Sequence, residues 1–121
     1  MQRKQVIFVA DSLDNAHRFQ QVLAGFDVEV AAGSSLQLKS LLAAHPSQDL
    51  VIYEAQGEAL GALSQVEAAL AEEGAGAMLV IVDERSLGEF RLPVAVRADF
   101  VVSGASPEEC AARIRQLLWP G

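Results

Sequence analysis

The chain has 121 residues, enough for one domain with a substantial hydrophobic core and too few for two. Hydrophobic residues make up 51% of it, which excludes bulk disorder. The net charge of −7 offers no basic field that would bind nucleic acid directly. A single cysteine excludes an internal disulfide, and no apolar run reaches the roughly 18 residues that a membrane span needs. The polar start, residues 1–5, predicts no signal peptide, so a cytoplasmic location is expected by default.

Short apolar runs alternate with segments of helical periodicity from the start of the chain. Residues 6–10 predict a buried strand, and Ser12 after it is placed to cap a helix through its hydroxyl. The apolar side of that helix is predicted from residues at helical spacing: Leu13, Ala16, Phe19, Val22 and Leu23. Residues 26–31 alternate acidic and apolar side chains, which is typical of a strand at the edge of a sheet. A second helix is predicted over residues 36–44, because Pro46 ends it.

The middle of the chain carries the central strand. Residues 49–55 are apolar and partly β-branched between two acids, which predicts a strand buried on both faces with Glu54 at its carboxyl end. Residues 58–73 predict a third helix, and residues 78–82 predict another buried strand. In residues 85–97 a glycine and a proline interrupt the pattern, so the fourth helix is expected to be shortened or irregular.

The end of the chain supplies a fifth strand and the best-marked helix. Residues 100–102 predict a short strand, Ser106 is the expected N-cap of the last helix, and Pro107 is its first residue. Strands separated by helices predict one α/β domain over residues 1–121, with a doubly wound five-stranded parallel sheet and helices on both faces. The flavodoxin-like strand order 2-1-3-4-5 fits best, because the polar strand 26–31 then lies at an edge.

Three acids follow or end neighbouring strands of this predicted sheet. Asp11, Glu54 and Asp83 are therefore expected on one surface. Two unit charges about 5 Å apart repel by roughly 3 kcal/mol at an effective dielectric constant near 20. Such a cluster needs a cation, a basic partner such as Arg85, or a shared proton, and its oxygens suit Mg²⁺ or Ca²⁺. For each acid alone, the alternative is a loop residue or a helix cap.

Over almost its whole length the chain resembles the receiver domain of bacterial response regulators, the family of the chemotaxis regulator. The resemblance rests on the Asp-Leu-Val-Ile run at residues 49–52 before Glu54. It rests also on residues 106–109 and 112–115, which resemble the last helix of the family. The resemblance implies a signalling role in a two-component pathway or phosphorelay. In that family the third strand ends in the aspartate that accepts a phosphoryl group.

Four positions depart from the pattern of the family, and the first two concern the acids. The family has two acids after the first strand that help to hold Mg²⁺, whereas this chain has Ala10 and Asp11 there. Glu54 stands at the phosphoacceptor position and places its carboxylate one methylene further out. In charge position it resembles a phosphorylated aspartate.

The other two departures concern the groups that stabilise an arriving phosphate. Asp83, or Val82 if the register slips by one, stands where the family has a Thr or Ser that hydrogen-bonds the phosphoryl oxygen. Ser103 and Gly104 stand where the family has a Lys-Pro pair, so no fixed cation is present. The degenerate pocket is predicted to consist of Asp11, Glu54, Asp83 and Ser103.

Together these departures predict that phosphoryl transfer does not occur. The chain is expected to be an atypical receiver, or pseudo-receiver, that is not an enzyme and binds other proteins. No cofactor is expected, and any Mg²⁺ binding at Asp11 and Glu54 is expected to be weak. The alternatives are a receiver that is still phosphorylated at Glu54 or Asp11, and a flavodoxin-like small-molecule binder. The binder is disfavoured because residues 11–15, after the first strand, are acidic and lack glycine.

A partner surface is predicted in the irregular segment 85–97. In the family, the fourth helix, the fifth strand and the fifth helix make the usual contact with partners. The partner is expected to be another signalling protein or an output domain, with a second copy of the chain as a further candidate. The alternative is a loop that packs on its own core. The residues expected to make the contact are Leu87, Phe90, Arg91, Leu92 and Arg97.

Overall fold

A computed structural model describes residues 3–74 and 76–120. The first residues of the polar start and the last residue of the predicted domain lie outside this described part. Five strands form one parallel sheet in the order β2-β1-β3-β4-β5, which confirms the predicted flavodoxin-like topology. The strands are β1 (Lys4–Val9), β2 (Val28–Gly33), β3 (Leu50–Ala55), β4 (Met78–Val82) and β5 (Ala98–Val102).

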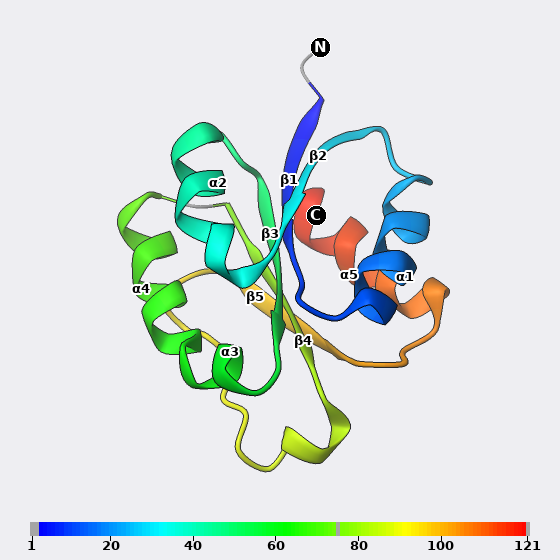
Figure 1. Cartoon of the computed structure of the whole chain (residues 1–121). Coiled ribbons are helices and arrows are strands. Elements are labelled where there is room, and N and C mark those ends of the chain that lie inside the picture. The colour runs from blue at the N-terminus through cyan, green and yellow to red at the C-terminus, as the bar shows by residue number, and fades with distance from the viewer. Residues whose placement is uncertain (1–2, 75, 121) are drawn as a thin grey trace.

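Helices cover both faces of the sheet. Figure 1 shows α1 and α5 on one side and α2, α3 and α4 on the other. Each side has its own hydrophobic cluster, because alternate strand residues point to opposite faces. The helices are α1 (Leu13–Leu23), α2 (Leu38–Ala44), α3 (Glu58–Gly61), α4 (Leu63–Glu72) and α5 (Pro107–Leu118), with 3₁₀ turns η1 (Ser35–Gln37) and η2 (Glu84–Ser86).

The central strand β3 is buried on both faces, as its sequence predicts. Leu50 and Ile52 pack into the cluster under α1 and α5, whereas Val51 and Tyr53 pack into the cluster under α2, α3 and α4. Because side chains alternate with a period of two, Glu54 follows Leu50 and Ile52 and faces α1. The strand therefore points a carboxylate into the protein beneath the start of a helix.

Some local predictions differ from the structure. The predicted helix over residues 58–73 is broken at Ala62, which ends α3 and precedes α4. Leu13 was expected on the buried face of the first helix and is 86% exposed. The buried face instead begins with Asn15, which shares a stripe with Phe19 and Val22 four and seven residues later.

The connection from β4 to β5 has only the short turn η2, which confirms the shortened fourth helix. The residues after it, 87–97, run along α4 and are called the strap below. The carboxylate of Glu67 on α4 accepts the backbone N–H groups of Val94 and Ala95 at 2.9 and 2.7 Å. Phe90 packs on Phe100 of β5 with ring centroids 5.3 Å apart. These contacts hold the strap in place of a helix.

None of the described helices combines the length and the apolar character that crossing a membrane requires.

Candidate functional site at the carboxyl edge of the sheet

Glu54 is the centre of a hydrogen-bond network at the carboxyl edge of the sheet, in the lower half of Figure 1. Its side chain is buried, with the residue only 3% exposed. Oε1 accepts the backbone N–H groups of Asp11 and Ser12 at 2.9 and 3.0 Å, and Oε2 accepts the side-chain amide of Asn15 at 2.6 Å. Both carboxylate oxygens therefore have donors from the protein itself.

The position of these donors follows from how α1 begins. Ser12 is the N-cap residue, and its hydroxyl accepts the N–H of Asn15 at 3.4 Å. The N–H groups before a helix have no acceptor inside it, and the helix dipole favours a negative charge at this end. Glu54 supplies both the acceptor and the charge, so the strand end and the helix start stabilise each other.

Asn15 extends the network to β5. Its amide nitrogen also donates to the hydroxyl of Ser103 at 3.3 Å, and the same hydroxyl accepts the side-chain amide of Gln56 at 2.8 Å. The residue after β5 is thereby joined to the residues after β3 and at the start of α1. Among the predicted pocket residues, Glu54 and Ser103 are brought together, with Asn15 between them.

The carboxylate of Asp11 points elsewhere. Oδ1 accepts the backbone N–H of Ser35 at 2.9 Å and Oδ2 accepts its hydroxyl at 2.8 Å, so Asp11 fastens the 3₁₀ turn η1 to the end of β1. Asp11 contributes its backbone N–H, and not its carboxylate, to the contact with Glu54.

Burial raises the pKa of Tyr53, and the negative charge of Asp11 raises it further.

Asp83 caps the 3₁₀ turn η2. Its Oδ1 accepts the backbone N–H of Arg85 at 2.8 Å, and its two oxygens accept the guanidinium of Arg85 at 3.2 Å each. The side-chain and backbone hydrogen bonds from Arg85 hold the pKa of Asp83 below its ordinary value. Val82 is the last residue of β4, so Asp83 is the residue that follows the strand. Asp83 is thus neutralised locally by Arg85.

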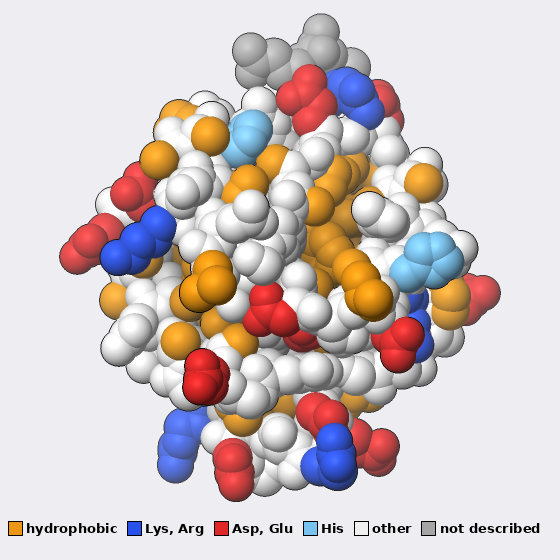
Figure 2. All heavy atoms as spheres, viewed as in Figure 1, with side chains coloured by type: hydrophobic (Ala, Val, Ile, Leu, Met, Phe, Trp, Pro, Cys, Tyr) orange, Lys and Arg blue, Asp and Glu red, His pale blue; other side chains and the backbone are white. Residues whose placement is uncertain are grey.

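Asp11, Glu54 and Asp83 follow or end neighbouring strands, β1, β3 and β4. Their carboxylates nevertheless accept hydrogen bonds from different partners. Figure 2 shows that, on the face of the molecule seen in Figure 1, acidic side chains are interspersed with basic and apolar ones. Within residues 3–74 and 76–120, no group of three or more His, Cys, Asp or Glu side chains is placed to hold a metal ion. The oxygens of Asp11 and Glu54 face N–H and O–H donors, and this arrangement does not fit Mg²⁺.

Two members of the network, Asn15 and Gln56, are absent from the predicted site. The signal for Asn15 was present in the sequence, because a polar residue lies on the stripe that carries Phe19 and Val22. Gln56 follows the central strand among other polar and small residues, and no pattern distinguishes it. Side-chain contacts between distant segments, such as Gln56 with Ser103, depend on tertiary packing.

The five predicted partner residues all lie on the strap. Leu87 and Leu92 are 38% and 42% exposed, whereas Phe90 is half-buried against the core. Arg91 and Arg97 are exposed and make no ion pair within the described part of the chain. The structure thus leaves apolar and cationic side chains accessible here.

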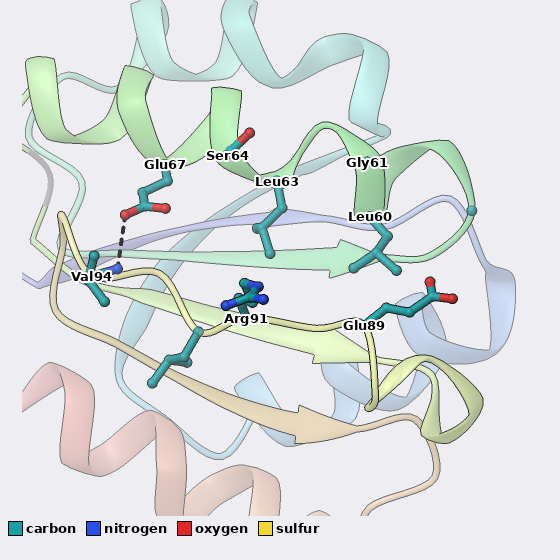
Figure 3. Close-up of a pocket in the computed structure, with 10 residues that line it drawn as sticks. Leu60, Gly61, Leu63, Ser64, Glu67, Glu89, Arg91 and Val94 are labelled. Atoms are coloured by element: carbon teal, nitrogen blue, oxygen red, sulfur yellow. Dashed lines mark hydrogen bonds between the residues drawn. The ribbon is translucent and has the colours of Figure 1, made fainter.

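The strap, α3 and α4 border a groove of about 780 Å³, which Figure 3 shows in close-up. Arg91 and Leu92 line it, whereas Leu87, Phe90 and Arg97 do not. This groove was not predicted from the sequence, because it depends on how the strap packs along α4.

No protein-family model and no curated protein matches the sequence. Solved structures do match. The signal receiver domain of an HD domain-containing protein from Pseudomonas fluorescens Pf-5 has a TM-score of 0.75 at 15% identity, over 98% of this chain and 88% of that one. The CheY-like protein TadZ from Pseudomonas aeruginosa PAO1 has a TM-score of 0.70 at 21% identity, over 95% and 99% of the two chains.

A third solved structure is HP1043, an orphan response regulator of H. pylori. It has a TM-score of 0.70 at 18% identity, over 97% of this chain and 99% of that one. At these identities the likeness establishes a shared fold. The chain therefore has the fold of CheY-like response-regulator receiver domains.

Proposed function

We propose that this chain is an atypical receiver: a cytoplasmic, non-enzymatic signalling module that binds other proteins without being phosphorylated. The observation that carries the proposal is the state of Glu54. The residue at the acceptor position is 3% exposed, and both of its oxygens accept hydrogen bonds from the protein. A carboxylate held in this way is poorly available as a nucleophile.

The surroundings of Glu54 support the same proposal. Phosphoryl transfer requires fixed positive charge or donors aimed at the arriving oxygens. The hydroxyl of Ser103 is neutral, and it already accepts hydrogen bonds from the side-chain amides of Asn15 and Gln56. Arg85, the cation nearest to this edge, is already paired with Asp83. An incoming phosphate would therefore find no free positive charge there to stabilise it.

The donors around Glu54 also make a cation unnecessary. Two backbone N–H groups and one amide stabilise its negative charge, which is the role that a metal ion would otherwise have. We expect the site to bind Mg²⁺ weakly if at all. Isothermal titration calorimetry measures this directly, and a micromolar dissociation constant would show that Asp11 and Glu54 still form an ion site.

The test of the proposal is treatment with acetyl phosphate and Mg²⁺, followed by intact-mass spectrometry. We expect no mass increase corresponding to one phosphoryl group, while a receiver domain with an intact acceptor aspartate, treated in parallel, gains one. A phosphoryl adduct mapped to Glu54 or Asp11 would overturn the proposal. An Asn15→Ala variant tests whether the hydrogen bonds to Glu54 are what makes its carboxylate unavailable, because it removes one of these donors and leaves Glu54 itself unchanged.

A flavodoxin-like small-molecule binder is less consistent with the site. Such proteins bind phosphate through N–H groups after the first strand. Here the N–H groups of Asp11 and Ser12 already donate to Glu54. Purified protein is therefore expected to show no flavin absorbance, and a bound flavin would contradict this expectation.

The proposed partner surface is the strap and its surroundings. Its exposed apolar side chains, Leu87 and Leu92, and its exposed cations, Arg91 and Arg97, are spread along the strap, a mixture typical of protein contact sites. The partner is a signalling protein or an output domain, with a second copy of the chain as a further candidate. Analytical ultracentrifugation distinguishes the second copy, because a stable dimer would double the sedimenting mass.

A further inference from the structure

The inference rests on the proposed function and concerns the place where the sheet lacks a helix. The connections from β1 to β2, β2 to β3 and β3 to β4 each contain an α-helix, whereas the connection from β4 to β5 contains only the turn η2 and the strap. The groove of about 780 Å³ lies beside α3 and α4, next to the segment that would otherwise be helical.

One side of the groove is apolar. Figure 3 shows the side chains of Leu60 and Leu63 extending from α3 and α4 toward the strap. Leu63 is already buried, at 7% exposed, and Leu60 is half-buried. Leu92 and Val94 of the strap also line the groove, and they are 42% and 92% exposed. The exposed apolar side chains, chiefly Leu92 and Val94, are stabilised when a partner covers them.

Three charged side chains follow one another along the groove. Figure 3 shows Glu67 at one end, Glu89 at the other and Arg91 between them. Glu67 accepts both strap N–H groups through Oε2. Glu89 and Arg91 make no ion pair within residues 3–74 and 76–120. The order of charge along the groove is therefore negative, positive, negative.

We propose that this groove binds one amphipathic helix of a partner protein, in the place of the missing crossover helix. The helix directs apolar side chains toward Leu60, Leu92 and Val94. It carries a cation, an anion and a cation in the order that complements Glu67, Arg91 and Glu89. This is the helix-in-groove mode of recognition, with charge order setting the direction of the bound helix.

The length of the groove limits the helix. From Glu89 to Val94 the strap can span at most about 18 Å, because a fully extended chain covers at most roughly 3.6 Å per residue. A helix of about three turns has a length near 16 Å. The bound segment is therefore short.

An extended peptide fits the strap less well. Adding a strand requires free backbone N–H and C=O groups along an edge. The N–H groups of Val94 and Ala95 already donate to Glu67. A helix satisfies its own backbone hydrogen bonds and needs only side-chain contacts, so it matches what the groove offers.

The experiment uses two helix-stapled peptides of about three turns, because short unstapled helices are marginal in water. Both carry two leucines one turn apart. One has the charge order Lys-Glu-Lys beside them, and the other has Glu-Lys-Glu. Each is titrated into the isotope-labelled protein, and amide chemical shifts are followed by NMR. We expect the Lys-Glu-Lys peptide alone to give saturable shifts, centred on Leu60, Leu63 and Arg91.

Matched variants test the charge order. The double variant Glu89→Lys/Arg91→Glu is expected to weaken binding of the Lys-Glu-Lys peptide by about tenfold or more. Leu36→Ser serves as the control, because Leu36 is 94% exposed and lies outside the groove. Equal binding of both peptides, shifts that map elsewhere, or no saturable shift would each overturn the inference.

The result is independent of the phosphorylation test. If neither peptide binds while acetyl phosphate leaves the mass unchanged, only the helix-binding inference fails. If a phosphoryl adduct forms on Glu54, the proposed function fails whatever the peptides do.

Discussion

The carboxyl edge around Glu54 and the groove beside the strap differ in how their polar side chains are used. Around Glu54, the donors and acceptors are paired within the chain, and Asn15 and Glu54 are almost fully buried. Beside the strap, Glu89 and Arg91 have no ion-pair partner in the described residues, and Leu92 is exposed. The first region has the character of a closed interior site and the second that of an open surface.

The difference supports the proposal that the domain contacts its partner at the strap. A buried polar network that is fully paired stabilises one arrangement of the segments that it joins. An open groove with unpaired charges leaves free energy to be gained on binding. This difference agrees with the proposed function, in which the domain binds a partner and does not accept a phosphoryl group.

The largest expected effect comes from opening the closed region. Glu54→Ala leaves the N–H groups of Asp11 and Ser12 and the amide of Asn15 without their acceptor. We expect a loss of about 3 kcal/mol in the free energy of unfolding, since buried donors left unpaired are costly. Urea denaturation measures it. Glu29→Gln, at an exposed position, is the control and should change stability by less than about 0.5 kcal/mol.

If Glu54→Ala proved as stable as the control, Glu54 would not stabilise this edge.

The second effect tests the link to β5. Asn15→Ala removes the donor shared by Glu54 and Ser103 and is expected to cost about 1.5 kcal/mol. Gln20→Ala, at an exposed site on the same helix, is the control. A double-mutant cycle with Glu54→Ala should show strong coupling, because both variants remove the same contact. Additive losses would mean that the two residues act separately.

The third effect concerns the strap. Glu67→Ala removes the acceptor of the Val94 and Ala95 N–H groups and is expected to cost about 1 kcal/mol. Hydrogen exchange at these two amides should accelerate, while exchange in β3 stays slow. Gln65→Ala is the control on the same helix. Unchanged exchange at Val94 and Ala95 would show that other contacts hold the strap.

The smallest effect concerns Asp83. Hydrogen bonds from Arg85 lower the pKa of Asp83 from its ordinary value of 3.8. A lowered pKa in the folded state means that the contribution to stability is present above the ordinary value and is lost as pH falls through the lowered one. The pair is exposed, so Asp83→Asn should change stability only slightly at neutral pH. An NMR titration of the Asp83 carboxyl checks the direction, and a raised pKa would contradict it.

Much of the fold was determined by local sequence patterns. The apolar run at residues 49–55 predicted a central strand that is buried on both faces. Ser106 with Pro107 predicted the start of α5, where the hydroxyl of Ser106 accepts the N–H of Glu109. The alternation of acidic and apolar residues over 26–31 indicated an edge strand, although β2 begins two residues later than predicted. These features depend on side-chain periodicity and capping, which involve residues close together in the chain.

The character of the site was decided by the tertiary structure. The sequence placed Glu54 at the end of the central strand, but only the packing of α1 against β3 turned its carboxylate toward Asn15. Likewise, glycine and proline predicted an irregular connection after β4, whereas the groove exists because Glu67 on α4 holds that connection beside it. Both outcomes depend on contacts between residues more than 25 positions apart, which no local pattern encodes.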